Sequence, residues 1–129
     1  MRLLLDTHVA IWTLTEPKRI PSDIYSTIRD TADAAVVSAA AVWEIAIKHR
    51  LHRPDSPPFT GQQAIGHFKN AGFDILDVSA HHAAFVERLP VLHSDPFDRL
   101  MLAQAAVEDM QFVTYDRQLA RYDVAMLTW

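Results

Sequence analysis

Short, nearly all-apolar runs alternate with helix-like stretches along this chain of 129 residues. The predicted strands cover residues 2–5, 34–38, 73–78 and 111–115, with a possible short fifth at 124–128. Strands that are apolar on almost every residue are typical of a parallel sheet that is covered on both faces. The pattern therefore predicts an α/β fold with three layers, α/β/α, around a central parallel sheet of four or five strands.

The predicted helices lie between these strands and carry recognisable start signals. In "HSDPFDRLMLAQA", Asp95 and Pro96 occupy the N-cap and first helical positions of the longest helix, 96–109. The other predicted helices cover residues 7–14, 21–32, 39–52, 60–71 and 79–89. The proline-rich stretch 53–59 is expected to be an exposed, mobile loop. With no internal repeat or domain boundary, residues 1–129 are predicted to form a single domain.

Composition excludes several classes of site. The chain has no cysteine, so a disulfide framework or a thiolate metal site is ruled out. Its net charge of −4 argues against binding nucleic acid through surface cations, unless clustered carboxylates hold metal ions that reverse the local field. The N-terminus lacks the pattern of a signal peptide and no apolar run approaches membrane-spanning length, so we expect a cytoplasmic protein without a membrane partner.

Two aspartates directly follow predicted strands. Asp6 ends the first strand after three leucines, and Asp116 follows "FVTY" of the fourth. Parallel sheets bind their ligands outside the carboxyl ends of their strands, so both residues are candidates for a site there. Either aspartate could also cap the helix that follows it, and position alone leaves both roles open.

Two further acids lie on predicted helices. Glu44 is the only charge in "AAAVWEIAI", which is apolar almost all round and is predicted to be largely buried. It could pair with Lys48 four residues on, but an inward-facing carboxylate is the sharper hypothesis. Asp98, at the third helical position, complements the helix dipole and is held in a fixed orientation, as a metal ligand must be. Four acids on separate segments suit a hard cation such as Mg²⁺ or Mn²⁺.

Together these segments resemble the PIN-domain ribonucleases, most closely the VapC-like toxins of type II toxin–antitoxin pairs. The matching stretches are "LLLDTHVAIW", "SAAAVWEIAIK", "DPFDRLMLAQA" and "VTYDRQLARY", which follow the family's order and span nearly the whole chain. The resemblance implies metal-dependent hydrolysis of RNA in a pocket of Asp6, Glu44, Asp98 and Asp116. It implies one or two Mg²⁺ or Mn²⁺ ions, with Asp6 and Asp98 as direct ligands. Glu44 and Asp116 would complete the shell, hold metal-bound water or act as base.

The resemblance also implies accessory residues and partners. Thr7 and Thr114 are carried over as hydroxyls near the metal and substrate. Arg99, directly after Asp98, is a candidate phosphate contact or else a solvated surface charge. The histidines show no zinc spacing, and we predict that His49, His52, His81 and His82 are structural. The implied partners are an antitoxin protein that binds a groove on the early helices, and a second copy of the chain in a homodimer.

Other functions remain open at this stage. A phosphoacceptor regulatory domain needs a carboxylate pair in the first loop, where this chain has Asp6 alone. An aspartyl-phosphate phosphatase needs a second aspartate two residues after the first, where this chain has His8. A catalytically silent Mg²⁺-binding interaction domain, and a PIN nuclease of RNA processing or decay, both keep the fold. A neighbouring gene for a DNA-binding antitoxin would favour the toxin.

Overall fold

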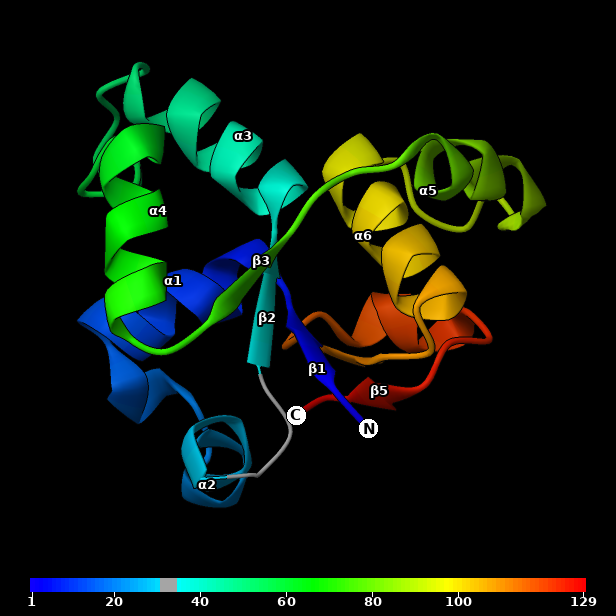
Figure 1. Cartoon of the computed structure of the whole chain (residues 1–129), viewed down its shortest axis with the longest axis horizontal. Helices are drawn as coiled ribbons and strands as arrows, with labels where there is room; N and C mark the ends of the chain where they lie inside the picture. Colours follow the sequence, from blue (N-terminus) through cyan, green and yellow to red (C-terminus); the bar gives the residue numbers. More distant parts are fainter. Residues whose placement is uncertain (31–34) are drawn as a thin grey trace.

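The computed structural model describes residues 1–30 and 35–129, and within them the chain forms a sheet of five strands (Figure 1). The strands are β1 (Leu3–Leu5), β2 (Ala35–Ser38), β3 (Asp74–Leu76), β4 (Gln111–Val113) and β5 (Met126–Leu127). Their order is β3-β2-β1-β4-β5, and all four pairings are parallel. The predicted parallel sheet is confirmed, with β1 at its centre.

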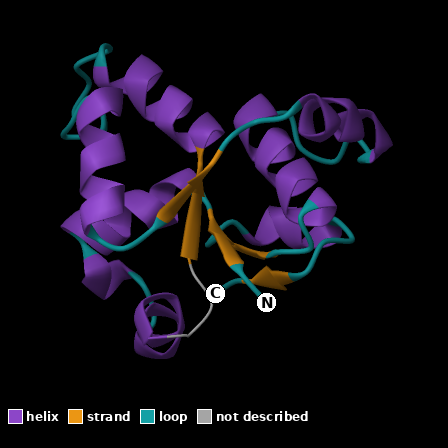
Figure 2. Ribbon diagram, viewed as in Figure 1, coloured by secondary structure: helices purple, strands orange, loops and turns teal. Residues whose placement is uncertain are grey.

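Helices cover the sheet on both sides, as Figure 2 shows. The α-helices are α1 (Thr7–Thr15), α2 (Ser22–Asp30), α3 (Ala39–His49), α4 (Gly61–Asn70), α5 (Ala80–Phe85) and α6 (Pro96–Val107). Three short 3-10 helices complete the described structure: η1 (Pro17–Arg19), η2 (Val86–Arg88) and η3 (Arg117–Arg121). The three-layer α/β/α architecture is therefore as predicted. In the described part of the chain, no helix combines the length and apolarity needed to cross a membrane.

Some predicted boundaries are wrong. The helix predicted over 39–52 ends at His49, and the chain leaves it through His52, whose φ of 50° belongs to the left-handed region that terminates helices. The helix predicted over 79–89 divides into α5 and η2. The ends of two predicted elements, residues 31–32 of a helix and residue 34 of a strand, lie outside the described residues.

The proline-rich loop at 53–59 is less exposed than predicted. Pro57 is buried and Phe59 is only 7% exposed. The carbonyl of Pro57 accepts a hydrogen bond from His49 Nδ1 at 2.9 Å, which ties the loop to the end of α3. An apolar ring and a satisfied carbonyl therefore anchor a segment whose composition alone indicates a free loop.

The parallel register places the carboxyl ends of the central strands at one edge. Leu5 pairs with Val37 on one side and with Val113 on the other, and all three are fully buried. The next residue, Asp6, continues the ladder by donating its N–H to the carbonyl of Val113 at 2.9 Å. The chain segments after β1, β2 and β4 thus begin side by side, above a wholly apolar sheet centre.

Candidate active site

Asp6 directly follows β1 and is held from two sides. Its carboxylate, in a residue only 3% exposed, accepts the N–H of His8 at 3.1 Å and so caps α1. The hydroxyl of Thr114 donates to the other carboxylate oxygen at 2.6 Å. Burial raises the pKa of Asp6, and the charge of Glu44 adds to the rise, although the hydrogen bonds from Thr114 and His8 oppose it. The cap and the site are therefore compatible roles of one carboxylate.

Thr114 joins two of the predicted acids. Besides donating to Asp6, its Oγ1 accepts the backbone N–H of Asp116 at 3.1 Å. Asp116 in turn caps η3 through the N–H of Gln118. Thr114 is completely buried, so this connection between the ends of β1 and β4 is shielded from water. Thr7, also predicted near the metal, is buried and directs its hydroxyl to the sulfur of Met101 at 3.9 Å.

Asp98 enters the site from the start of α6. As predicted, Asp95 is the N-cap and accepts the N–H groups of Phe97 and Asp98 at 2.8 and 3.2 Å. Burial raises the pKa of Asp98 to about 7, and the charges of Asp6, Asp95 and Glu44 add to the rise. A hydrogen bond from His93 acts in the opposite direction. This carboxylate is held among other negative charges at an energetic cost, which is common at functional sites.

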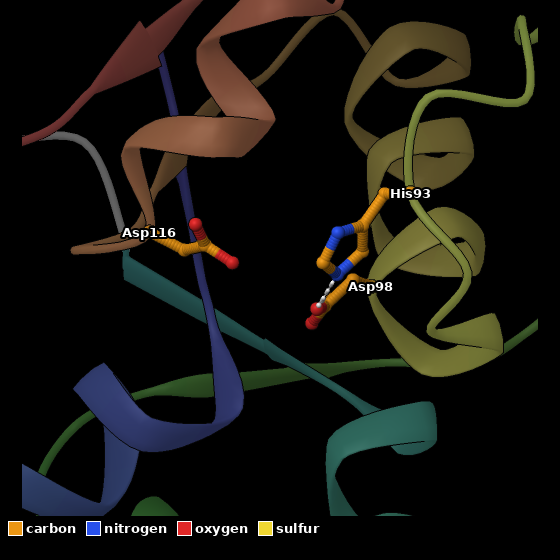
Figure 3. Close-up of side chains that lie close together, drawn as sticks. All are labelled: His93, Asp98 and Asp116. Atoms are coloured by element: carbon orange, nitrogen blue, oxygen red, sulfur yellow. Dashed lines mark hydrogen bonds and ion pairs between the residues drawn. The ribbon is translucent and has the colours of Figure 1, made fainter.

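His93 belongs to the site although the sequence analysis did not single it out. Its Nε2 lies 3.0 Å from Asp98 Oδ2, and its side chain is 17% exposed. His93, Asp98 and Asp116 each present a ligand atom within 4.8 Å of the others (Figure 3). The spacing of His93 in the sequence does not indicate this role, because the residue lies in the loop before α6 and approaches Asp98 only through the path of that loop. Its position inside "HSDPFD" is the one available signal.

Glu44 both pairs with Lys48 and is buried, so the two interpretations of its sequence context apply together. It forms the ion pair with Lys48 at 2.5 Å, yet it is only 2% exposed. Lys48 remains 41% exposed; burial lowers its pKa, but the bond to Glu44 and that residue's charge outweigh this and raise it. The second oxygen, Oε1, is buried and has no hydrogen-bond partner among residues 1–30 and 35–129. Because a buried carboxylate oxygen is rarely left unsatisfied, this atom fits a site that receives a cation or a water molecule.

The donor set fits a divalent ion of the Mg²⁺ or Mn²⁺ type. Carboxylate oxygens predominate, as hard cations require, and one imidazole nitrogen is available beside them. The charge of Glu44 raises the pKa of both Asp6 and Asp98, so these carboxylates repel one another across one small region. A divalent cation would remove that repulsion.

A cleft of about 540 Å³ opens beside the acids. Glu44 and Thr7 belong both to its lining and to the predicted site. Its walls come from α1, α3, residues 54–58 and Tyr115. The cleft therefore lets a ligand larger than a metal ion approach Glu44.

Arg99 is occupied elsewhere. Its guanidinium donates to the carbonyls of Leu89 and Val86 at 3.0 and 3.4 Å, which ties α6 to η2. Its Nε is buried and unpartnered within the described part of the chain. These contacts indicate that Arg99 positions the loop before α6, and they do not support the predicted contact with phosphate.

Comparisons with known proteins agree with this fold. The family model of the PIN domain matches residues 3–125. Ribonuclease VapC22 of Mycobacterium tuberculosis is 32% identical over 120 residues, which cover 91% of this chain and 88% of that protein. VapBC2 from Rickettsia felis, solved with a DNA fragment from its promoter, superposes with a TM-score of 0.75 at 17% identity and covers 100% of this chain and 99% of that one. DNA-bound VapBC from Salmonella typhimurium gives a TM-score of 0.70 at 15% identity, with 100% and 98% covered.

Proposed function

Because this chain belongs to the PIN-domain family, we propose that it is a divalent-metal-dependent ribonuclease and the toxin of a type II toxin–antitoxin pair. Its cleavage of RNA would inhibit translation and growth. The observation that carries the proposal is the meeting of Asp98, Asp116 and His93 within 4.8 Å, beside the buried carboxylates of Asp6 and Glu44. The relative from Mycobacterium tuberculosis, which is named a ribonuclease, supports the same reaction.

The acids would hold the metal and orient water. We propose Asp6 and Asp98 as direct ligands, with Asp116 and His93 completing the set. When bound, one or two Mg²⁺ or Mn²⁺ ions would supply an activated water and stabilise the leaving oxygen of the phosphodiester. Glu44 Oε1, buried and free of partners in the described chain, would accept a hydrogen bond or proton from that water. Thr114 would keep Asp6 in place through its 2.6 Å hydrogen bond.

Charge explains how an acidic protein can accept RNA. The four site acids equal in number the net charge of −4, so the rest of the chain is formally neutral. With the carboxylates neutralised by metal, the cleft would no longer repel a phosphate backbone. Lys48, half-exposed on its wall, would add a positive charge facing the substrate.

The proposed protein partners are an antitoxin and a second copy of the chain. The similar structures include VapBC assemblies, which supports an antitoxin partner here. For the homodimer, support comes from an apolar stripe on and just after α3, where Trp43, Ile47 and Leu51 are 58%, 43% and 48% exposed. Residues four apart on a helix share one face, so the stripe offers a continuous surface. A toxin that cleaves the RNA of the cell that makes it would act in the cytoplasm.

A cleavage assay tests the enzymatic proposal. The purified chain should cut RNA with Mg²⁺ or Mn²⁺ and lose that activity in EDTA. Asp98→Asn should lower the rate at least about a hundredfold while the circular dichroism spectrum stays unchanged, since it removes a proposed ligand. Asp95→Asn is the matched control and should keep the activity, because asparagine also caps well and the loss of stability stays below about 1 kcal/mol. Cleavage by Asp98→Asn at the parent rate would refute the metal role.

A growth assay tests the biological proposal. Induction of the parent chain in a bacterium without the antitoxin should stop growth, whereas Asp6→Ala should not. Equal growth of the two cultures would refute the toxin function. If the purified parent still cleaved RNA, that result would favour a nuclease of RNA processing or decay.

A further inference from the structure

Three aromatic rings lie together on the wall of the cleft. The rings of Trp12 and Tyr115 are 4.8 Å apart between centroids, and His8 lies 6.0 Å from Tyr115 and 6.3 Å from Trp12. All three residues line the cleft. We call His8, Trp12 and Tyr115 the aromatic cluster. It joins α1 to the segment after β4, so it spans the same two chain segments as Asp6 and Asp116.

The rings differ in what they expose. Trp12 is only 8% exposed, and the guanidinium of Arg19 covers its ring at 4.4 Å. Tyr115, by contrast, is 43% exposed, and the side chain of His8 is 47% exposed. The buried indole therefore supports two rings whose surfaces are open to the cleft. Exposed aromatic surface next to a polar site is a common mark of a binding surface.

The aromatic cluster directly adjoins the acids. Tyr115 lies between Thr114 and Asp116 in the chain, and the backbone N–H of His8 holds the carboxylate of Asp6. A ligand whose reacting group reached the acids would thus place its neighbouring group against Tyr115 and His8.

We propose that the exposed rings of Tyr115 and His8 form a stacking platform for one nucleobase of single-stranded RNA, next to the phosphate that is cut. The inference rests on the proposed ribonuclease function. Bases of any identity stack on aromatic side chains, whereas paired bases are already stacked within the duplex. The platform therefore selects unpaired RNA without selecting a base. Lys48 on the cleft wall suits the phosphates of such a strand better than it suits an apolar peptide.

Fluorescence of a stacked base tests the platform without relying on cleavage. The probe is a short single-stranded oligoribonucleotide with one 2-aminopurine. It is titrated in Mg²⁺ with the Glu44→Gln chain, which keeps the proposed metal ligands but lacks the proposed proton acceptor, so that the strand remains intact. Binding should quench the 2-aminopurine. Adding Tyr115→Leu should weaken binding by roughly tenfold and remove the quench, because leucine keeps apolar volume but has no aromatic face. Tyr115→Phe should retain both, and the same probe paired into a duplex should bind more weakly.

A second tyrosine provides the matched control. Tyr25 is partly buried and lies on α2, away from the cleft lining, so Tyr25→Leu should leave binding and quenching unchanged. The platform would be overturned if the RNA did not bind, or if it bound without quenching of the 2-aminopurine. It would also be overturned if Tyr115→Leu quenched as strongly as the chain with Tyr115, or if Tyr115→Phe lost as much binding and quenching as Tyr115→Leu. The proposed function fails by a different result, namely intact RNA after incubation with the parent chain and Mn²⁺.

Discussion

The molecule contains two histidine–carboxylate pairs. One is a structural contact, and the other lies in the candidate active site. His82 Nε2 lies 2.8 Å from Glu108 Oε1, and His93 Nε2 lies 3.0 Å from Asp98 Oδ2. The two pairs contain the same chemical groups at nearly the same separation. They differ in what surrounds them.

Among the described residues, no buried side-chain nitrogen or oxygen around His82 lacks a hydrogen-bond partner. His82 Nδ1 accepts the N–H of Ser79, so its Nε2 carries the proton and donates to Glu108. The nearby Gln104 is fully buried, accepts from the hydroxyl of Ser38 and donates to the carbonyl of Asp77. Glu108 is 39% exposed, so its charge remains hydrated. A satisfied network of this kind joins α5 to α6 and the sheet.

The surroundings of His93 contain an excess of carboxylates. Burial and the charges of Asp6, Asp95 and Glu44 raise the pKa of Asp98 to about 7, and Glu44 Oε1 has no partner in the described residues. The two pairs therefore differ in whether the polar groups around them are fully hydrogen-bonded, and not in the histidine–carboxylate contact itself. Three experiments test this difference between the two regions.

The largest effect on stability should come from His82. Its side chain is 2% exposed, and His82→Ala removes two hydrogen bonds and leaves a cavity, at a cost of about 3 kcal/mol in the free energy of unfolding. Urea denaturation measures this loss. Cleavage per folded molecule should stay near that of the parent, because the network lies apart from the proposed ligands. A large loss of that activity would show that the two regions are coupled.

A smaller effect should appear in the pH dependence of stability without metal. With its pKa raised from 3.8 to about 7, Asp98 binds its proton more tightly in the folded than in the unfolded chain. The free energy of unfolding should therefore fall as the pH rises from about 4 to about 7, by on the order of 2 kcal/mol after screening is allowed for, and then level off. The raised pKa of Asp6 acts in the same direction.

Denaturation in EDTA at several pH values checks this slope. Asp98→Asn should flatten it, whereas Glu108→Gln, in the satisfied network, should leave it unchanged. If the free energy of unfolding of the parent chain rose over the same pH interval, the raised pKa of Asp98 would be contradicted.

The smallest effect should come from His93. As a nitrogen donor beside oxygens, it should favour Mn²⁺ over Mg²⁺, so His93→Ala should weaken Mn²⁺ binding about tenfold and Mg²⁺ binding less. Isothermal titration calorimetry with each metal measures the difference. His81→Ala, which changes an exposed histidine on α5, is the control. Equal losses for both metals would show that His93 only positions Asp98.

The fold could be predicted because its determinants are local. Apolar runs indicated all five strands, and Asp95 with Pro96 indicated the start of α6 correctly. Residues that follow a parallel strand must gather at its carboxyl end, so Asp6 and Asp116 could be placed in one region from sequence. Glu44 could be recognised because a lone charge in an apolar helix requires a special environment.

What could not be predicted depends on the paths of loops. His93 reaches Asp98 because of the course of residues 89–95, and Phe59 is buried because its loop folds back on the end of α3. Arg99 follows Asp98 directly, but the helical turn between them directs its guanidinium to carbonyls on η2 and just after it. The chemistry of a residue type is readable in sequence, whereas the direction of its side chain depends on its neighbours in space.

The central place of β1 in the sheet has a consequence for synthesis. Its two neighbours are β2, which begins at Ala35, and β4, which begins only at Gln111. Until β4 has left the ribosome, β1 has no strand to pair with on that side. Asp6 then also lacks the hydrogen bond from Thr114 and the neighbouring Asp116. Since distant pairings form late in folding, a nascent chain would carry scattered acids and no assembled centre. The order of the strands thus prevents the proposed centre from assembling until β4 and the residues after it have been synthesised.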